Sequence, residues 1–331
     1  MEAIKIVVTD YIEPDLEWER EQLAKYEHVT LEYHQLKFVP QEELIEAIRD
    51  ADAILVNMTA MTAEIMDQLD KCKLIIRHGV GYDNVDVAAA TERGIRVAYE
   101  PDYCTDEVAE HAIALMLAAW RKIGIGRQVL EDSSKNGIWD FEPIYPITSL
   151  KGKTLGIVGC GRIGSTVLAR LESFGFEFVV CDPYLSDERS RELGVRVVDL
   201  ATLLKESDIV TVHAALTKEN QNLIGEEQLR QMKPTAYLVN TARGGLVDTV
   251  ALARALKENW IAGAAIDVYV TEPPDQEFPL FECETCLLAP HLGWYSEEAN
   301  WSIREKVLED FVRFAEGRPP RYLINKELLE S

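Results

Sequence analysis

The first hundred residues alternate short apolar runs with amphipathic stretches. The run Ile4–Asp10 has the length of one buried strand, whereas Gln41–Asp50 and Val85–Arg93 carry apolar residues at helical spacing, and Gly94 closes the second of these stretches. The other strands predicted here are Thr30–His34, Ala53–Asn57, Leu74–His78 and Ile95–Ala98. Strands that alternate with helices in this way predict a parallel sheet with right-handed crossovers.

The pattern changes in the middle of the chain. Thr105, Asp106 and Glu107 are typical of a capped helix start with an acidic first turn. The stretch Val108–Trp120 that follows is apolar and alanine-rich enough for a largely buried helix. Residues 121–150 contain Gly, Ser, Asn and Pro, and they predict an irregular arm.

A second alternating series begins at Lys153, and a long helix is predicted over Glu297–Phe314, ended by Gly317. The tail Tyr322–Asn325 is too short to fold alone, so we expect it to return to the first unit. The strands predicted in the second series are Thr154–Val158, Glu177–Cys181, Ile209–His213, Ala236–Asn240, Ala262–Asp267 and Thr285–Ala289. The sequence therefore predicts an α/β protein of two doubly wound parallel-sheet domains, one discontinuous over 1–103 and 300–331, the other over 104–299.

Composition narrows the kinds of partner. The 331 residues include 34 basic and 57 acidic residues, and the net charge of −23 disfavours binding to nucleic acid or to anionic membranes. An anionic substrate would therefore need positive charge supplied locally by its site. No signal peptide or membrane span is visible, and six scattered cysteines favour reduced thiols, so we expect a cytoplasmic protein. Cys283 and Cys286 have C-x-x-C spacing without a second pair or a nearby histidine, so we expect no metal site.

A glycine-rich loop follows the first strand of the second series. Gly159, Gly161 and Gly164 form G-x-G-x-x-G between that strand and a helix predicted over Ser165–Phe174. In a dinucleotide-binding unit the first glycine permits a tight turn, the second lets the backbone approach a pyrophosphate, and the third lets helix and strand pack closely. The next strand ends at Asp182, which would accept hydrogen bonds from the adenosine ribose and repel a 2′-phosphate. We therefore expect a Rossmann domain that binds NAD in preference to NADP.

Three further segments fall at or just after predicted strand ends of the same domain, where open α/β sheets bind ligands. They are Asn240–Asp248, Asp267–Pro274 and Pro290–Trp294. Together with the glycine loop, these segments resemble the D-2-hydroxyacid dehydrogenase family, and the resemblance runs from Arg77 to Asn300. It implies an NAD-dependent enzyme that interconverts a 2-oxo acid and its D-2-hydroxy acid, with a flavodoxin-like substrate domain beside the Rossmann domain.

The resemblance implies a catalytic set of Arg243, Glu272 and His291. Arg243 would orient the substrate carboxylate and polarise its carbonyl, because the planar guanidinium fork suits both tasks. His291 would give a proton to the carbonyl oxygen during reduction and accept it in the reverse direction. Glu272 would hold the far side of the imidazole, which fixes its tautomer and keeps it charged for reduction.

Other family positions are expected beside the cofactor. Asp267 matches the residue that binds the nicotinamide carboxamide, Thr241 and Ala242 would lie beside the nicotinamide ribose, and Thr105 would lie near the phosphates. The segment His213–Thr217 resembles the family's His-x-Pro-Leu-Thr segment on the adenine side, with an alanine in place of the proline. The full set expected at the cofactor is Val80, Thr105, Gly159, Gly161, Arg162, Ile163, Gly164, Asp182, His213, Ala214, Ala215, Thr217, Thr241, Ala242, Arg243, Asp267, His291 and Trp294.

The segment Arg77–Asn84 resembles the family's substrate loop. The amides of Val80 and Gly81 would bind the substrate carboxylate, and Arg77 would add positive charge, although a salt bridge to a neighbouring carboxylate is the alternative for this arginine. Trp294 is unusual for the wider family, and with Arg77 it resembles the C-terminal-binding-protein branch. An apolar wall at Trp294 would favour an apolar or thioether-bearing 2-oxo acid over glyoxylate or a sugar phosphate.

Two other functions remain open at this point. C-terminal-binding proteins are NAD-sensing corepressors, so the same fold could serve as a scaffold, although this chain lacks long disordered tails and a basic localisation run. A dehydrogenase of formate or phosphite is the second alternative, and Glu272 in the family's acid position favours hydroxyacid chemistry over it. The resemblance also implies a homodimer, with an arm over Glu107–Thr148 and with Trp120 and Trp139 as apolar anchors.

Overall fold

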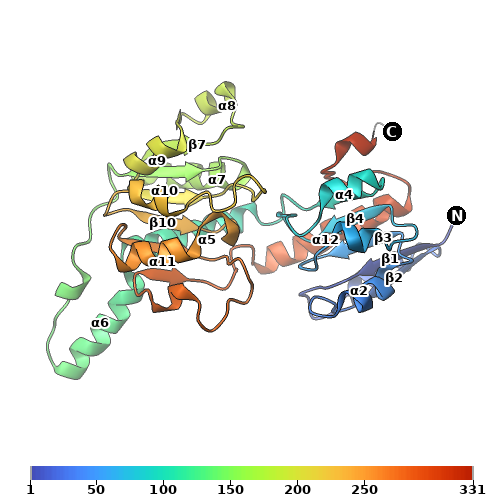
Figure 1. Ribbon diagram of the computed structural model, residues 1–331, viewed down its shortest axis with the longest axis horizontal. Coiled ribbons are helices and arrows are strands. Elements are labelled where there is room, and N and C mark those ends of the chain that lie inside the picture. Colours follow the sequence, from blue (N-terminus) through green and yellow to red (C-terminus); the bar gives the residue numbers. More distant parts are fainter. Residues whose placement is uncertain (1, 330–331) are drawn as a thin grey trace. The chain divides into compact units, whose positions relative to one another are not determined.

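The chain divides into two compact units, and the computed structural model describes residues 2–329. Unit 1 contains the residues up to Tyr103 and those from Ser296 onward, and unit 2 contains Cys104–Tyr295. Figure 1 shows that each unit combines strands with surrounding helices. Both have the doubly wound parallel-sheet architecture that the alternation of strands and helices predicts.

Unit 1 is built on a five-stranded parallel sheet in the order β2-β1-β3-β4-β5, which is the flavodoxin-like order. Its strands are β1 (Ile4–Val8), β2 (Val29–Tyr33), β3 (Ala53–Val56), β4 (Leu74–Arg77) and β5 (Arg96–Tyr99). Its helices are α1 (Glu17–Leu23), α2 (Gln41–Ile48), α3 (Ala63–Met66), α4 (Val87–Glu92), α12 (Glu297–Ala315) and the 3-10 turn η5 (Lys326–Leu329).

Alternate side chains of β1, β3, β4 and β5 enter opposite helix layers, whereas β2 has exposed side chains at Thr30 and Glu32. In β1, Ile6 and Val8 pack in the same cluster as Phe311 of α12, whereas Val7 packs with Ile48 of α2. A strand covered on both faces needs no polar face. This explains why the strands can be recognised in the sequence as continuous apolar runs.

The tail after α12 returns to β5. Leu323 forms an antiparallel bridge with Ala98, and the N–H of Ile324 donates to the carbonyl of Val97 at 2.8 Å. The buried Asn325 side chain accepts from the N–H of Val97 at 2.9 Å. Unit 1 is therefore completed by residues from both parts of the sequence.

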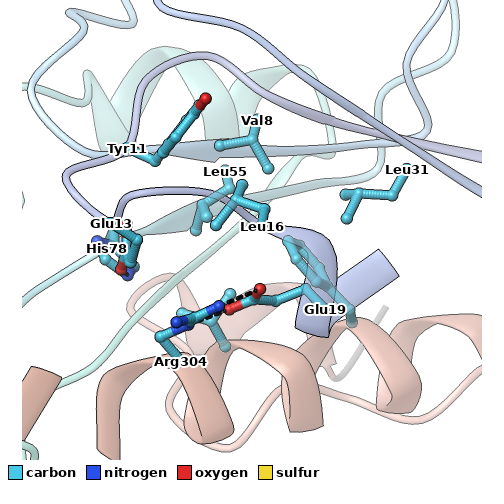
Figure 2. A pocket seen from close by; sticks show the side chains of 11 residues that line it. Val8, Tyr11, Glu13, Leu16, Glu19, Leu31, Leu55, His78 and Arg304 are labelled. Atoms are coloured by element: carbon cyan, nitrogen blue, oxygen red, sulfur yellow. Dashed lines mark hydrogen bonds and ion pairs between the residues drawn. The ribbon is translucent and has the colours of Figure 1, made fainter. Parts of the chain in front are cut away.

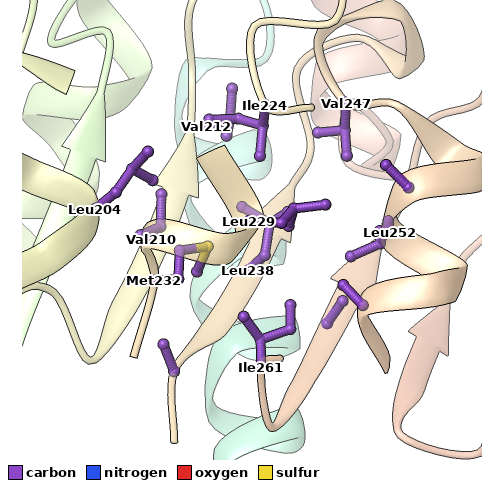
Figure 3. Packing of buried hydrophobic residues seen from close by; sticks show 14 of the residues in the cluster. Leu204, Val210, Val212, Ile224, Leu229, Met232, Leu238, Val247, Leu252 and Ile261 are labelled. Atoms are coloured by element: carbon purple, nitrogen blue, oxygen red, sulfur yellow. The ribbon is translucent and has the colours of Figure 1, made fainter. Parts of the chain in front are cut away.

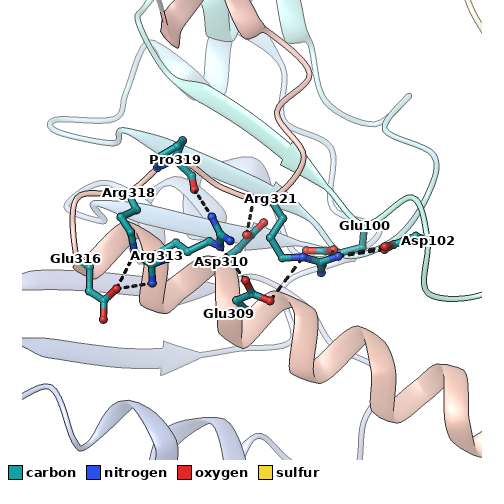
Figure 4. A network of polar contacts seen from close by, with 9 residues as sticks. All are labelled: Glu100, Asp102, Glu309, Asp310, Arg313, Glu316, Arg318, Pro319 and Arg321. Carbon is teal, nitrogen blue, oxygen red and sulfur yellow. Dashed lines mark hydrogen bonds and ion pairs between the residues drawn. The ribbon is translucent and has the colours of Figure 1, made fainter.

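A polar network joins the end of α12 to the residues after β5, as Figure 4 shows. Arg321 lies 3.3 Å from Glu100 and 3.1 Å from Asp102, and its N–H donates to Asp310. Burial and the charge of Asp310 raise the pKa of Glu100 to about 8, against the attraction of Arg321. Burial likewise raises the pKa of Asp310 to about 6, although the Arg321 N–H opposes this. The network thus holds two buried carboxyl groups that resist ionisation.

Unit 2 is built on a seven-stranded parallel sheet in the order β12-β11-β10-β9-β6-β7-β8, which contains the Rossmann strand order. Its strands are β6 (Thr154–Val158), β7 (Glu177–Cys181), β8 (Arg196–Val197), β9 (Ile209–Val212), β10 (Tyr237–Asn240), β11 (Gly263–Ile266) and β12 (Cys286–Leu288). Its helices are α5 (Thr105–Trp120), α6 (Ile123–Asn136), α7 (Arg162–Leu171), α8 (Asp187–Glu192), α9 (Leu200–Glu206), α10 (Glu226–Gln231) and α11 (Thr249–Lys257). The 3-10 turns are η1 (Glu142–Ile144), η2 (Glu172–Phe174), η3 (Gly244–Leu246) and η4 (Pro279–Glu282).

Apolar layers cover both faces of this sheet as well. Figure 3 shows one of them, in which Leu229 of α10, Leu238 of β10 and Leu252 of α11 pack together. On the other face, Val239 of β10 packs in one cluster with Met116 of α5. The two layers fix the strand ends, and the loops that follow those ends carry the candidate site.

Two local predictions are wrong. The arm over residues 121–150 contains the 14-residue helix α6, whose side chains are all outside the core, so no apolar periodicity reveals it. Thr105 is the first residue of α5 and not its cap, because Cys104 occupies the cap position without a side-chain hydrogen bond. Within residues 2–329, no helix has the length and apolar character needed to cross a membrane.

Candidate active site

The glycine loop joins β6 to α7, and its three glycines have different surroundings. A Cβ on Gly159, where φ is 86°, would lie 2.7 Å from the backbone nitrogen of Ala214, and one on Gly164 would lie 2.2 Å from the carbonyl oxygen of Gly159. A Cβ on Gly161 would meet no atom within 4 Å. Gly161 directly precedes Arg162 at the start of α7, where the first amides of a helix point toward a ligand. The loop therefore has the close packing and the open backbone that a pyrophosphate requires.

Asp182 follows β7 and holds the same loop in place. Its Oδ2 accepts the N–H of Cys160 at 2.8 Å, and its Oδ1 accepts the N–H of Tyr184 at 2.9 Å. The half-buried carboxylate thus links the glycine loop to the end of the neighbouring strand. Asp182 has this structural task in addition to the ribose contact that the sequence predicts.

Two buried polar atoms after β9 and β10 make no hydrogen bond to residues 2–329, namely Nδ1 of His213 and Oγ1 of Thr241. The other ring nitrogen of His213 lies 2.9 Å from the hydroxyl of Thr211, and burial lowers the pKa of His213 to about 4. Buried polar atoms almost always have a partner in folded proteins. Together with the open backbone at Gly161, these two atoms fit a bound dinucleotide.

His291 and Glu272 come together from the loops after β12 and β11. The Nδ1 of His291 lies 2.7 Å from Oε2 and 2.9 Å from Oε1 of Glu272, which also accepts the N–H of Tyr269. Burial alone would raise the pKa of Glu272, but the hydrogen bond and charge of His291, the Tyr269 N–H and the Arg243 charge together lower it below its ordinary value. Glu272 is therefore an ionised acceptor at Nδ1, which leaves Nε2 of His291 for another partner.

The turn that carries Arg243 is shaped by Asn240, which is buried at the end of β10. The side chain of Asn240 accepts the N–H of Ala242 at 3.1 Å and donates to the carbonyl of Arg243 at 2.8 Å. A Cβ on Gly244 would lie 2.1 Å from backbone of the loop after β11, so the two loops touch through their main chains. The Arg243 charge acts on Glu272 across this contact. Unit 2 thus brings the three predicted catalytic side chains into one group.

Asp267, at the end of β11, supports the loop that carries His291. Its side chain is 1% exposed, its Oδ1 accepts the N–H of Leu292 at 3.0 Å, and its Oδ2 accepts the N–H of Gly293 at 2.9 Å. His111 of α5 lies 3.2 Å from the same Oδ1. His111 stands in no recognisable motif, and the sequence does not reveal its place. A nicotinamide carboxamide would have to use the lone pairs of Asp267 that these contacts leave.

The predicted substrate loop follows β4 in unit 1. The Arg77 guanidinium lies against Gly79, where φ is 146°, and donates to the carbonyl of His78. Val80 and Gly81 are half-buried. In unit 2, the half-buried Trp294 packs its ring edge to face with Tyr295, with centroids 5.3 Å apart.

A small pocket in unit 1 contains a second group of charges, as Figure 2 shows. Arg304 donates to both carboxylate oxygens of Glu19, at 2.6 and 2.7 Å. His78 lies 3.3 Å from Glu13, and burial lowers the pKa of His78. Arg304 and Glu19 therefore form a structural ion pair in this pocket.

Residues 113–293 match the family model described as D-isomer specific 2-hydroxyacid dehydrogenase, NAD binding domain. The chain belongs to this family. As a D-2-hydroxyacid dehydrogenase homologue it is an oxidoreductase with an NAD-binding domain, as the glycine loop predicts.

The relatives cover nearly the whole chain. Glyoxylate reductase of Thermococcus litoralis is 41% identical over 304 residues, which are 89% of this chain and 90% of the relative. D-3-phosphoglycerate dehydrogenase of Archaeoglobus fulgidus is 41% identical over 88% of this chain but only 54% of its own length. The structure of D-lactate dehydrogenase from Aquifex aeolicus, complexed with NAD and lactic acid, gives a TM-score of 0.83 at 28% identity, covering 94% of this chain and 96% of that one.

Proposed function

We propose that this chain reduces a 2-oxo acid to its D-2-hydroxy acid with NADH and catalyses the reverse reaction with NAD. The observation that carries this proposal is the 2.7 Å contact between His291 and Glu272 beside the Arg243 charge. An imidazole with one nitrogen fixed by a carboxylate and the other available is suited to general acid–base catalysis. Membership of the family supports the class of reaction.

Reduction adds a hydride to the carbonyl carbon and a proton to the carbonyl oxygen. Bound NADH supplies the hydride. His291 supplies the proton from Nε2, because Glu272 occupies Nδ1. Arg243 binds the substrate carboxylate and draws electron density from the carbonyl. In oxidation, His291 accepts the proton of the hydroxyl group.

The cofactor would be held mainly by unit 2. The backbone at Gly161 and the first turn of α7, including Arg162 and Ile163, would bind the pyrophosphate. Thr241 and His213 supply the buried polar atoms described above. Asp182 would accept the ribose hydroxyls, and its negative charge supports NAD over NADP.

The predicted substrate loop after β4 is proposed to bind the substrate carboxylate as well. Arg77 and the amides of Val80 and Gly81 would bind the carboxylate, so the site would supply the local positive charge that the acidic chain needs. The likeness to the C-terminal-binding-protein branch, which rests on Arg77 and Trp294, stays a prediction. The relatives reported above instead support the reduction of glyoxylate or of another small 2-oxo acid.

The size of the substrate side chain is a separate question. An apolar wall at Trp294 favours a substrate such as 4-methylthio-2-oxobutyrate, whereas the named relatives favour glyoxylate. We propose that the apolar substrate is preferred. The test compares kcat/KM for 4-methylthio-2-oxobutyrate, pyruvate, glyoxylate and phosphohydroxypyruvate. A tenfold advantage of glyoxylate or of the phosphorylated acid would overturn the apolar preference and leave the reaction class intact.

The variant His291→Gln tests the proposed function. NADH absorbance should show that its kcat falls at least about 10²-fold, because the proton donor is lost. The affinity for NADH, followed by fluorescence, should stay within about twofold. His34→Gln, at a partly exposed histidine of unit 1, is the control and should keep full activity. Retained turnover in His291→Gln would remove His291 from the role of general acid.

We also propose a homodimer formed through the arm that includes α6. The exposed apolar side chains of the arm support this proposal, and they are Ile123, Leu130, Ile138, Trp139, Phe141 and Tyr145. Trp120 is not an anchor, because it is 5% exposed and donates its indole N–H to the carbonyl of Thr148 within unit 2.

A further inference from the structure

The backbone N–H groups of three consecutive residues in the loop that carries His291 all donate to Asp267. The carbonyl of Asp267 accepts the N–H of His291 at 2.8 Å. The carboxylate of Asp267 accepts the N–H groups of Leu292 and Gly293, each through a different oxygen. Asp267 therefore fixes the path of the backbone at the proposed proton donor.

The backbone of His291 needs such support. Its φ is 55°, in the left-handed region that residues with a Cβ rarely adopt. A residue keeps this conformation only when the surrounding structure holds it there. The position of the His291 ring thus depends on the position of the Asp267 carboxylate.

His111 is the side chain that reaches this carboxylate from outside the loop. Its Nε2 lies 3.2 Å from Oδ1 of Asp267 and makes no hydrogen bond to residues 2–329. The same ring backs the loop, since a Cβ on Gly293 would lie 3.5 Å from the ring carbon Cδ2 of His111. His111 thus contacts both the buried carboxylate of Asp267 and Gly293, whose N–H this carboxylate accepts.

The helix does not depend on His111 for its own packing. Ala109, Ala112 and Met116 of α5 are buried in the core of unit 2, whereas the His111 side chain is 24% exposed. An apolar face of this kind is enough to hold a helix against a sheet. The contact with Asp267 is therefore an addition to the packing of α5.

We propose that His111 is a positioning residue for the acid–base reaction, acting on His291 through Asp267. This inference rests on the function proposed above. The ring of His111 lies beside Oδ1 of Asp267, the same carboxylate oxygen that accepts the N–H of Leu292. The carboxylate is held in turn against the amides of Leu292 and Gly293, and the proton donor keeps its orientation.

Two variants and a control test the inference. His111→Ala removes the contact, and His111→Gln can restore a donor near the position of Nε2. Glu110→Gln, at an exposed residue of the same helix, is the control for a change of charge on α5. The measurements are kcat and KM for a 2-oxo acid, the Kd of NADH, the Tm, and hydrogen exchange of a peptide covering residues 288–295 without ligand.

We expect kcat to fall about tenfold in His111→Ala, while the Tm and the Kd of NADH stay close to those of the parent chain. His111→Gln should recover at least half of the lost activity, and Glu110→Gln should match the parent. The 288–295 peptide should exchange several-fold faster in His111→Ala alone. This pattern would distinguish positioning from a general loss of structure.

Other outcomes would overturn the inference. If the parent chain turns over a 2-oxo acid and His111→Ala matches it within twofold, the inference fails and the proposed function stands. Equal loss of kcat in both variants with unchanged exchange of the 288–295 peptide would also overturn it. A parent chain that reduces no 2-oxo acid while it binds NADH would remove the proposed function and this inference with it.

Discussion

At the residue scale, the three glycines of the loop after β6 show how one residue type meets three different demands. Gly159 lies against the backbone at Ala214, and Gly164 lies against the carbonyl of Gly159. Gly161 has open space above it and backbone angles that other residues also adopt. Close packing therefore accounts for two of these glycines, whereas the third is the one proposed to bind a ligand.

Matched alanine substitutions separate these demands. Gly161→Ala should leave the Tm within about 2 °C of the parent, because its methyl group meets no atom, but it should weaken NADH binding at least about tenfold by filling the approach to the pyrophosphate. Gly164→Ala should lower the Tm by several degrees, since its Cβ would lie 2.2 Å from a backbone oxygen. Calorimetry and NADH fluorescence measure both effects, and equal Tm losses in the two variants would contradict this account.

Individual site residues differ in how far the sequence reveals them. Arg243, Glu272 and His291 could be predicted because each stands in a motif after a predicted strand. His111 could not, since only the folded chain brings it beside Asp267 and the loop that carries His291. No spacing along the sequence encodes which elements lie side by side.

At the scale of elements, strands are easier to predict than exposed helices. Strands buried on both faces are continuous apolar runs, and β6 and β7 begin and end where the sequence predicts. Helix α6 has glycines at 124 and 126 and buries no residue, so propensity and periodicity both argue against it. The exposed side chains of α6 make the helix difficult to predict. The same exposure leaves its apolar side chains accessible to a partner.

The arm is expected to form the dimer contact. Light scattering should give a mass near twice 37.4 kDa for the parent chain, and the double variant Ile138→Glu/Trp139→Glu should shift it toward 37.4 kDa, because two charges would enter an apolar interface. The control is Tyr184→Ser, which should remain dimeric. Tyr184 is 94% exposed and lies in the loop between β7 and α8. A monomeric parent chain at micromolar concentration would exclude the dimer.

At the scale of the whole molecule, the two parallel sheets follow from the alternation of strands and helices along the chain. The two buried carboxyl groups at the end of α12 do not, because Glu100 and Asp310 are far apart in the sequence. Their environment has a consequence for stability. A carboxyl group whose pKa is raised in the folded state holds its proton longer there than in the unfolded chain, so stability falls as the pH rises between the two pKa values.

Glu100 should therefore reduce the stability of the protein between about pH 4.5 and pH 8, the ordinary and the raised pKa of its carboxyl group. Glu100→Gln cannot ionise, so its Tm relative to the parent should rise by about 3 °C or more from pH 5 to pH 8. Glu316→Gln, at an exposed carboxylate of the same network, is the control and should show no such change. A parallel pH dependence in Glu100→Gln and the parent would refute the proposed origin.

The return of the tail to β5 has a consequence for synthesis on the ribosome. The pieces that complete unit 1, namely α12 and residues 322–325, are translated only after all of residues 104–295. The first 103 residues therefore emerge without the helix and tail that cover their apolar surface. While unit 2 is being made, the sheet of unit 1 has one apolar face that α12 does not yet cover, and this face favours aggregation.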